Sequence, residues 1–374
     1  MDVQKRAIVI GGGIVGLTSG LALRRAGLEV VIYERASEIR AAGAGLGLWA
    51  NALAVFDELG VGEEVRAIGK PSEMYFHDAD GRLLDTPEFG VEDHRFLLVH
   101  RAKLNDLLAD AVGRENIRLA TGFDEYTEHA DRVTVRLSDG SSEDADVLVG
   151  ADGAYSAVRA QLVPGSEAQE HAGHHAWRAV LPAAGGMVTE NRLVLGPHGC
   201  RGGYVRTYDG GVYWLVNQFD THSLTGTLKE QALQRAAHLD GDGRDPVLTE
   251  LISATPEELI LHNQIMLVPP LPRWVSARVV LAGDAAHAMS PHITAGATLG
   301  VEDAALLGRL LTPTADVPAA LAAYEAGQIP RYAHVARLSA AVEHAPTPQE
   351  FAHHYAAFSH WMITPATAEN QVRA

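Results

Sequence analysis

The feature that most constrains the fold is a glycine-rich turn near the N-terminus, between two short apolar runs. The runs at 7–10 and 28–33 have the length and β-branched content of buried strands. Between them, apolar residues recur at helical spacing until Gly27, a residue typical of helix C-termini. The pattern predicts a strand–helix–strand unit whose helix starts within the turn Gly11-Gly12-Gly13-Ile14-Val15-Gly16.

Each glycine of this Gly-x-Gly-x-x-Gly motif has a physical role at a nucleotide site. Gly11 permits the tight turn, Gly13 lets the backbone approach a pyrophosphate, and Gly16 lets helix and strand pack closely. The helix N-terminus offers free N–H groups and partial positive charge to phosphates. Glu34, which follows the second strand, can accept hydrogen bonds from a ribose and would repel a 2′-phosphate. The motif therefore favours FAD or NAD over NADP, with a glycine-rich turn that binds no ligand as the alternative.

The charge balance limits other functions. The chain has 374 residues, with 30 Lys and Arg against 47 Asp and Glu, and a net charge of −17. Nucleic acids and anionic membranes are bound by clustered basic residues, so we expect neither as a partner. The uncharged run 7–23 superficially resembles a signal peptide, but glycines interrupt it and no small-residue cleavage site follows. No segment is long enough to span a bilayer.

Cysteine and histidine usage predicts neither a disulfide nor a metal site. Cys200 is the only cysteine, which excludes an intramolecular disulfide and favours a reducing, cytoplasmic location. Histidines gather at 171–175 and at 353–354 without the spacing of a known ligand set. We therefore expect hydrogen-bonded or solvated histidines and no metal ion.

Two later segments repeat the pattern of a buried strand followed by a small-residue turn. The run 145–149 leads into Gly150-Ala-Asp152-Gly153, and the run 278–282 leads into Gly283-Asp284. Between them, from about 164 to 273, β-branched and aromatic runs alternate with glycine-rich turns, which is typical of an antiparallel sheet. Helices are expected over 301–311 and 317–326, and through Trp361.

This order predicts a nucleotide-binding domain that is interrupted by a sheet-rich insert. The fold class expected is α/β, with a Rossmann-like domain interleaved with a mostly antiparallel β-sheet domain and followed by C-terminal helices. The expected boundaries are 1–70, 97–164 and 274–374 for the cofactor domain, and 71–96 and 165–273 for the substrate domain.

Three separated signatures together resemble one family, the single-component FAD-dependent aromatic hydroxylases of the para-hydroxybenzoate hydroxylase type, which are class A flavoprotein monooxygenases. The resemblance covers nearly all of residues 5–331, and its middle part is similar to the compact salicylate- and urate-hydroxylase-like branch. The signatures are Gly11-x-Gly13-x-x-Gly16 with Glu34-Arg35, Gly150-Ala-Asp152-Gly153-x-x-Ser156-x-Val158-Arg159, and Leu281-Ala-Gly283-Asp284-Ala-Ala-His287 with Pro291 and Glu302-Asp303-Ala304.

The resemblance implies FAD as the cofactor and NADH or NADPH as a transient co-substrate, without a second dinucleotide domain. Asp284 would bind the ribityl hydroxyls, and Arg101 the pyrophosphate or ribityl chain. Asp152 and Arg159 would serve FAD and the nicotinamide cofactor together. Each could instead be an ordinary turn, capping or solvated residue. The expected cofactor-binding residues are Gly11, Gly13, Ile14, Val15, Gly16, Glu34, Arg35, Gly45, Arg101, Phe123, Asp152, Arg159, Gly283, Asp284, Pro291, Gly296 and Ala297.

The loop expected beside the flavin departs from the family pattern. Thr294-Ala295-Gly296 stands where members usually carry Gly-Gln-Gly, while Pro291 and Gly296 remain. Loss of glycine should stiffen this loop, so the reaction outcome stays open. Gln328 likewise stands where an Arg is common.

The activity implied is hydroxylation of a small aromatic or polycyclic substrate with NAD(P)H and O2, through a C4a-hydroperoxyflavin. The family has no shared catalytic acid or base, so the catalytic residues are unknown, and a structural role suits His287 best. Arginine suits a carboxylate or phenolate, although a packed or solvated strand residue is the commoner situation. The candidate substrate contacts are Arg178, Arg201, Tyr204, Arg206, Tyr213 and Trp214.

Two alternatives stay open. One is a flavoenzyme of the same fold that carries out epoxidation, reduction, dehydrogenation or cyclisation. The other is a flavin-binding protein without turnover. The partners expected are a small aromatic substrate, O2 and NAD(P)H, and the chain is expected to be a monomer or a homodimer.

Overall fold

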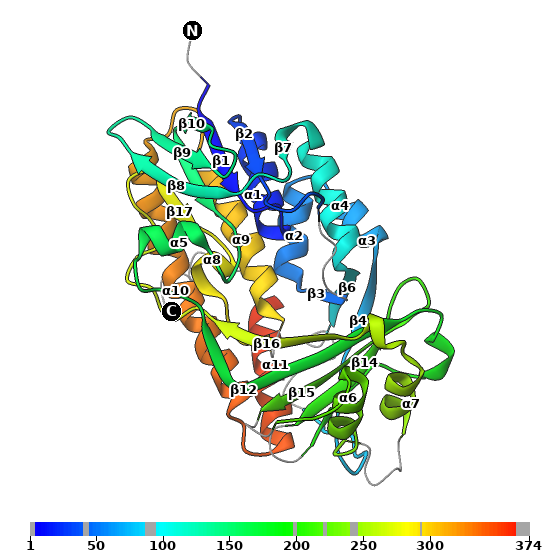
Figure 1. Cartoon of the computed structure of the whole chain (residues 1–374). Coiled ribbons are helices and arrows are strands. Elements are labelled where there is room, and N and C mark those ends of the chain that lie inside the picture. The colour runs from blue at the N-terminus through cyan, green and yellow to red at the C-terminus, as the bar shows by residue number, and fades with distance from the viewer. Residues whose placement is uncertain are drawn as a thin grey trace.

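The protein consists of a parallel sheet at one end and a larger antiparallel sheet at the other, connected by long strands and helices (Figure 1). The computed structural model describes residues 4–39, 45–86, 95–196, 200–219, 223–239, 246–291 and 294–363.

The first sheet has five strands in the order β17-β11-β1-β2-β7, and every neighbouring pair is parallel. Its central strands are apolar and almost fully buried, as expected for parallel strands that are covered on both faces. The strands are β1 (Arg6–Ile10), β2 (Glu29–Tyr33), β7 (Ile117–Arg118), β11 (Val147–Gly150) and β17 (Val279–Leu281).

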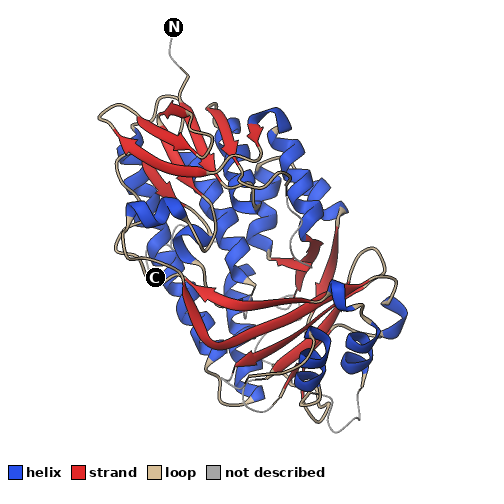
Figure 2. Cartoon of the chain, in the orientation of Figure 1, coloured by secondary structure: helices blue, strands red, loops and turns tan. Residues whose placement is uncertain are grey.

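Helices cover one face of this sheet, and a three-stranded antiparallel sheet covers the other (Figure 2). Helix α1 packs against both α4 and α9. The contact between α1 and α9 is close, because a Cβ at Gly308 would lie 2.9 Å from the Cβ of Ala22. These elements are α1 (Ile14–Arg25), α2 (Ala50–Glu58), α3 (Gly62–Ala67), α4 (Arg101–Val112), α5 (Ala157–Leu162), α8 (Asp284–His287), α9 (Ala295–Leu310), β8 (Phe123–Glu128), β9 (Val133–Leu137) and β10 (Ser142–Ala145).

The second large sheet has six strands in the order β16-β12-β15-β14-β13-β5. All its pairs are antiparallel except β13 with β5. The long strands β12 and β16 run from the first domain into this sheet (Figure 1). The strands are β5 (Tyr75–Asp78), β12 (Gln169–Leu181), β13 (Arg192–Leu195), β14 (Arg201–Arg206), β15 (Val212–Phe219) and β16 (Leu261–Leu267).

The two faces of this sheet have separate hydrophobic cores. The outer face packs under α6 and α7, whereas the inner face turns toward the first domain and packs against the C-terminal helix α11. A third sheet, in the order β3-β6-β4, lies between the two domains (Figure 1). These elements are α6 (Leu228–Ala236), α7 (Val247–Ala254), α10 (Val317–Glu343), α11 (Pro348–Ile363), β3 (Gly45–Leu48), β4 (Gly69–Glu73) and β6 (Arg95–His100), with 3-10 turns at Arg114–Asn116, Gly185–Met187 and Glu257–Leu259.

Several elements differ in extent from the sequence-based expectation. The segment expected as one strand over 145–149 divides into β10 and β11, because the carboxylate of Asp146 accepts a hydrogen bond from the N–H of Arg6 at 2.8 Å. Helix α9 starts at Ala295 rather than at 301. Helix α10 continues through Pro330 to Glu343. The insert also contains two helices, α6 and α7, whereas its sequence pattern predicted a mostly antiparallel sheet.

Residues of the expected domain segment 71–96 divide between two sheets. Strand β5 joins the six-stranded sheet through β13, whereas β4 and β6 pair with each other in the small sheet. No helix within the described ranges is both long and apolar enough to cross a membrane.

Candidate functional site

The glycine turn between β1 and α1 has the geometry of a phosphate-binding turn. Gly11 has φ +111°, and a Cβ there would lie 2.3 Å from the carbonyl oxygen of Ala151. A Cβ at Gly16 would lie 1.9 Å from the carbonyl oxygen of Gly11, so neither position admits a side chain. At Gly13, by contrast, a Cβ would meet no atom within 4 Å. The N-terminus of α1, which begins with Ile14 and Val15, therefore opens onto empty space that an anionic group can enter.

Glu34 lies beside this turn at the end of β2. Its Oε2 accepts a hydrogen bond from the N–H of Gly12 at 2.7 Å, and its Oε1 accepts one from the N–H of Ala36 at 2.8 Å. Phe123 is half-buried at the start of β8. Two residues before it, the N–H of Thr121 donates a hydrogen bond to the carbonyl oxygen of Glu34 at 3.0 Å. Because the carboxylate is held in place, it can bind a sugar hydroxyl at the edge of the turn. The neighbouring Arg35 is exposed.

A second turn, between β17 and α8, packs directly on the first. Gly283 has φ +60°, and a Cβ there would lie 2.7 Å from Cγ2 of Val15. The side chain of Asp284 is exposed, and its Oδ1 lies 3.7 Å from the position of a Cβ at Gly296. The starts of α8 and α9 therefore face each other, with a carboxylate between them.

Arg159 is placed differently from what the family resemblance implies. Its side chain is only 2% exposed, and its guanidinium donates to the carbonyl oxygens of Ser166 at 2.9 Å, Ala285 at 3.0 Å and Ala154 at 2.6 Å. The guanidinium is thus used to join α5 to the start of α8. We therefore do not propose that this side chain contacts a cofactor directly.

Asp152 caps helix α5. Its Oδ1 accepts a hydrogen bond from the hydroxyl of Ser156 at 2.5 Å, and its Oδ2 accepts one from the N–H of Ala157 at 2.8 Å. Burial raises the pKa of this carboxyl group above its ordinary value. The backbone of Asp152 also packs behind Gly11, where a Cβ would lie 3.1 Å from its Cα.

Arg101 interacts electrostatically with one charged group on each of two other elements. It is the first residue of α4 and is exposed. Desolvation lowers its pKa, the charge of Asp284 raises it, and the charge of Arg178 lowers it. These interactions mean that the three groups, from α4, α8 and β12, share one polar region.

The inner face of the six-stranded sheet supplies a compact polar group to this region. Arg178 Nη2 donates a hydrogen bond to Asn263 Oδ1 at 2.9 Å across β12 and β16. Arg178 Nε is buried and has no hydrogen-bond partner in the described part of the chain. Tyr213 lies on the same face, with its Cγ 3.5 Å from the position of a Cβ at Gly45, and burial raises its pKa. Asn263 was not predicted, because an isolated polar residue on a strand has no sequence signal.

Trp214 and Tyr204 lie on the opposite, outer face, in the core under α6 and α7. Trp214 is fully buried, and its Nε1 donates to the hydroxyl of Thr255 at 2.8 Å. Arg206 follows Tyr204 on that face, and its guanidinium donates to the carbonyl oxygen of Val188. Side chains alternate between faces along a strand, so these three cannot meet a ligand on the inner face. The expectation that they contact substrate is therefore corrected.

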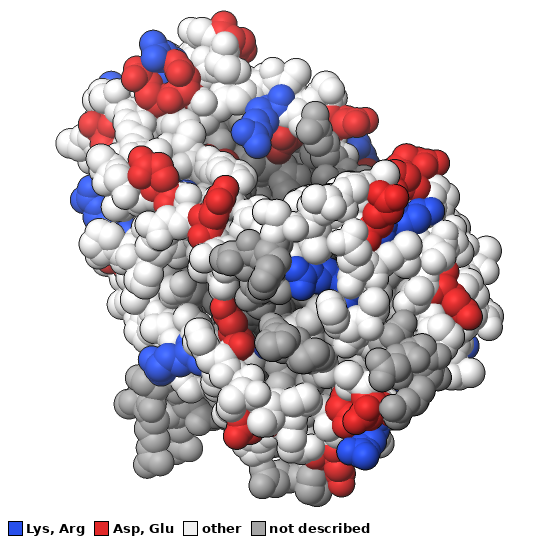
Figure 3. All heavy atoms as spheres, turned by 60° about the horizontal axis from the view of Figure 1, so that its bottom comes forward, with Lys and Arg blue, Asp and Glu red and all other residues white. Residues whose placement is uncertain are grey.

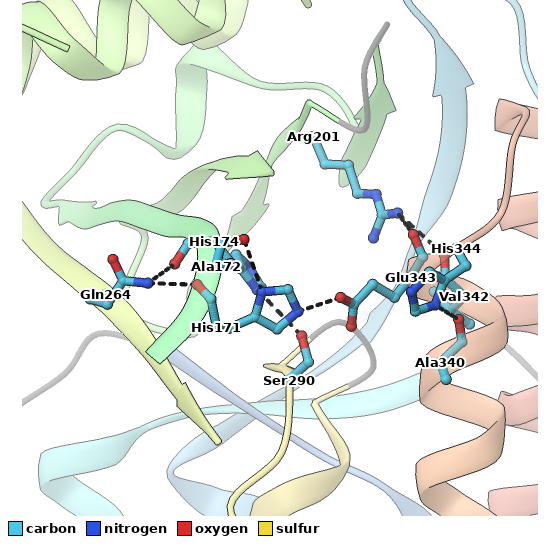
Figure 4. Close-up of polar contacts among 10 residues, drawn as sticks. All are labelled: His171, Ala172, His174, Arg201, Gln264, Ser290, Ala340, Val342, Glu343 and His344. Atoms are coloured by element: carbon cyan, nitrogen blue, oxygen red, sulfur yellow. Dashed lines mark hydrogen bonds and ion pairs between the residues drawn. The ribbon is translucent and has the colours of Figure 1, made fainter. Parts of the chain in front are cut away.

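Arg201 does lie on the inner face, but its guanidinium joins the sheet to the C-terminal helices (Figure 4). Its Nη2 donates to the carbonyl oxygens of Val342 and Glu343, each at 3.2 Å, and the group stacks 4.2 Å from the ring centre of Phe351. Burial lowers the pKa of Arg201 to about 10. Nearby, His171 pairs with the carboxylate of Glu343. Arg201 is therefore better explained as an anchor for the end of α10 than as a substrate contact.

The loop before α9 carries a strained residue. Thr294 has φ +50°, a left-handed conformation that is unusual for a β-branched side chain. Its Oγ1 lies 3.2 Å from the position of a Cβ at Gly47. Pro291 is exposed, whereas Gly296 and Ala297 are half-buried in the first turn of α9. Thr294 thus lies against β3 at the start of α9.

A metal site requires clustered ligating side chains, and a nucleic-acid surface requires clustered basic ones. Among the described residues, no three His, Cys, Asp or Glu side chains are arranged to hold a metal ion. On the face drawn in Figure 3, acidic and basic side chains of the described residues are interspersed, unlike the continuous basic surface that binds nucleic acid.

Comparison with known proteins identifies relatives over nearly the whole chain. A family model described as "FAD binding domain" matches residues 4–339. Aurachin C monooxygenase/isomerase of Stigmatella aurantiaca is 34% identical over 341 residues, which cover 88% of this chain and 87% of that protein. The 6-hydroxynicotinate 3-monooxygenase of Bordetella bronchiseptica is 30% identical, and 91% of each chain is covered.

A solved structure shares the whole architecture. Klebsiella pneumoniae HpxO complexed with FAD and uric acid superposes on this chain with a TM-score of 0.83 at 27% identity. The superposition covers 100% of this chain and 98% of that one.

Proposed function

This chain belongs to the FAD binding domain family and is a flavoprotein monooxygenase, and from that premise we propose that its substrate is an N-heteroaromatic ring with an oxo or hydroxyl group. The family, the fold class and the FAD cofactor predicted from the sequence are confirmed. The observation that carries the proposal is the Arg178–Asn263 pair on the inner face of the substrate sheet.

The cofactor site fits FAD along its length. The open N-terminus of α1 at Gly13 would hold the pyrophosphate, and Glu34 the adenosine ribose. Asp284 would hold the ribityl hydroxyls, with Arg101 adding positive charge nearby. Bound FAD supplies two-electron reduction by NADH or NADPH and the activation of O2. The substrate screen described below compares NADH with NADPH and so distinguishes between them.

The substrate class follows from the donors and acceptors that the inner face presents. Arg178 offers N–H groups, including the buried Nε, to an oxo or phenolate oxygen. The amide of Asn263 offers a donor and an acceptor beside it, which suits the N–H and C=O edge of a ring lactam. The ring of Tyr213 supplies a flat apolar contact at the same place. Two relatives act on or bind such compounds by name, 6-hydroxynicotinate and uric acid.

The chain's own groups position and shield the substrate. Glycines of β3 bring the backbone against Tyr213 and Thr294 beside this region. Packing of this kind would exclude water from the reacting ring and strengthen each hydrogen bond made to it. We also propose a cytoplasmic location, since the sequence has a single cysteine, Cys200, and so no intramolecular disulfide.

The test is a screen of substrate-stimulated oxidation of NADH and of NADPH by the purified yellow protein. Quinolones, hydroxypyridines and oxopurines are compared with phenols and salicylates of similar size, and O2 uptake and hydroxylated product are measured. The nitrogen heterocycles are expected to stimulate oxidation with stoichiometric product. Stimulation by carbocyclic phenols alone would refute the substrate class.

A second candidate reaction on the same site is a reduction or dehydrogenation that does not consume O2, because the strained Thr294 stands in the loop expected beside the flavin, where a stiffer loop could change how the flavin reacts. Product formation at equal rates with and without O2 would favour it over hydroxylation.

A further inference from the structure

A buried carboxylate lies directly behind the turn that presents Asp284. Asp303, on α9, is 1% exposed, and its Oδ2 accepts hydrogen bonds from the N–H of Gly283 and from Nε2 of His287, both at 2.7 Å. Its Oδ1 accepts a hydrogen bond from Nε2 of Gln328 on α10 at 2.6 Å. One side chain thus binds the residue before α8, the last residue of α8, and α10.

We propose that Asp303 is a positioning residue for FAD, acting through the Gly283 turn and Asp284. The inference rests on the proposed role of Asp284 in holding the ribityl chain. Helix α8 has only four residues, so hydrogen bonds at its two ends fix the direction of the whole element. When those ends are fixed, the carboxylate of Asp284 is presented before the cofactor arrives, which lowers the entropic cost of binding.

The packing around the turn explains why a hydrogen-bonded anchor is needed there. A Cβ at Gly300 would lie 2.4 Å from Cγ2 of Val15 and 3.3 Å from the Cα of Gly283. The side chain of Val15 therefore fills the space between Gly283 and Gly300, and neither glycine position has room for a side chain that could brace the turn. Helix α9, which carries Asp303, also starts at the loop that faces Asp284. The hydrogen bonds of Asp303 therefore fix the start of α8 relative to the start of α9.

The charge of this carboxylate is matched by His287. Among the described residues, no Lys or Arg is hydrogen-bonded to Asp303, and Gln328 is neutral. The imidazole of His287 contacts the rings of Trp274, at 5.1 Å, and Tyr332, at 5.4 Å between ring centres, and aromatic faces favour a cation. His287 is thus a partner of Asp303 rather than a base facing the substrate.

The test is a double-mutant cycle on FAD affinity, measured by titrating the apoprotein with FAD. Asp303→Ala removes an ionic acceptor for three donors, and it is expected to raise the dissociation constant by about 10- to 100-fold. Asp303→Asn can keep the hydrogen bonds if the amide of Gln328 turns over, but it loses the negative charge, so a smaller loss of about three- to tenfold is expected. Combined with Asp284→Ala, the Asp303→Ala change should add less than about threefold, because its effect passes through Asp284.

The control is Glu302→Gln on the same helix. Its carboxylate binds Asn51 and Arg331 and does not touch the turn. This variant should bind FAD within about twofold of the wild type.

The outcomes separate this proposal from the proposed function. If Asp284→Ala leaves FAD affinity unchanged, the role of Asp284 is wrong. If it weakens FAD but Asp303→Ala does not, or if the two effects multiply in full, Asp303 is not a positioning residue. Should Asp303→Ala fail to fold, the same cycle with Asp303→Asn decides, with a loss of about three- to tenfold expected and an unchanged affinity overturning the proposal.

Discussion

The carboxylate of Glu34 accepts a hydrogen bond from the N–H of Gly12 at 2.7 Å, across the turn that joins β1 to α1. A residue at the end of one strand is therefore locked against the glycine motif at the end of its neighbour. The carboxylate is fixed without any ligand, so a ribose placed at this edge of the turn would meet a rigid acceptor.

Removal of this acceptor should weaken FAD binding. Glu34→Ala is expected to raise the FAD dissociation constant by about tenfold, because charge-assisted hydrogen bonds contribute about 1.5–3 kcal/mol each and part of this is regained from water. Titration of the apoprotein with FAD measures it. The matched control is Glu125→Ala, an exposed carboxylate on β8, which should leave the affinity unchanged. Equal affinities for both variants would contradict the assignment of Glu34.

Arg178 should matter for substrate and not for FAD. Arg178→Met keeps the length of the side chain but removes its donors, so kcat/KM should fall by about 10- to 100-fold through KM. FAD affinity and the slow oxidation of NAD(P)H without substrate should stay the same. Steady-state kinetics with the best substrate of the screen measures the effect. A variant with wild-type KM would show that the substrate binds elsewhere.

Trp214 offers the opposite case, since it lies on the strand next to that of Arg178 in the same sheet but faces outward. Trp214→Phe removes the hydrogen bond to Thr255, and the free energy of unfolding should fall by about 1–3 kcal/mol. Denaturant unfolding measures the loss. Kinetic constants should stay within about twofold, and a specific rise in KM would contradict the placement of Trp214.

The left-handed backbone of Thr294 should be relieved by glycine. Such a conformation costs an L-residue about 1–2 kcal/mol, and glycine gives back about 0.5–1 kcal/mol through its unfolded-state entropy. Thr294→Gly is therefore expected to raise the free energy of unfolding by up to about 1 kcal/mol. The control, Ala295→Gly in the regular first turn of α9, should lower it by about 1 kcal/mol. Destabilisation by both variants would show that Thr294 is not strained.

The pair of His287 and Asp303 predicts a dependence of stability on pH. The carboxylate of Asp303 raises the pKa of the buried His287 against the desolvation that would lower it. The charge of Asp284 on α8 also raises it, and the rings of Tyr332 on α10 and of Trp274, which pack against the imidazole, carry no charge.

A histidine whose pKa is raised on folding adds stability that is fully present below the unfolded pKa, about 6.5, and is lost as pH rises through the folded value. The melting temperature of the wild type should therefore exceed that of Asp303→Asn most at about pH 6, and the difference should shrink toward about pH 9. Thermal melts of both apoproteins across this range measure it. A difference that grows with pH would have the wrong sign.

Much of the cofactor site could be predicted from the sequence because its residues are local to their motifs. A tight turn between a strand and a helix needs glycine at Gly11 and Gly16, and the structure has both without room for a side chain. The same holds for the turn at Gly283. Strand alternation was also visible in the substrate sheet, but its phase was not: Arg178 and Tyr213 face inward, whereas Tyr204 and Trp214 face outward. Because apolar residues occur on both faces of these strands, the sequence alone does not show which face is turned inward.

The sequence by itself determined the strand–helix–strand unit, the family, and the two acidic residues, Glu34 and Asp284, that follow buried strands. These depend on steric limits and hydrogen bonds within a few residues of the chain. Only the tertiary structure decided which arginines are free for a ligand. It joins Arg159 to backbone carbonyls, Arg201 to the end of α10, and leaves Arg178 beside Asn263. The partners of a long charged side chain lie on elements distant in sequence, and packing of the whole chain selects them.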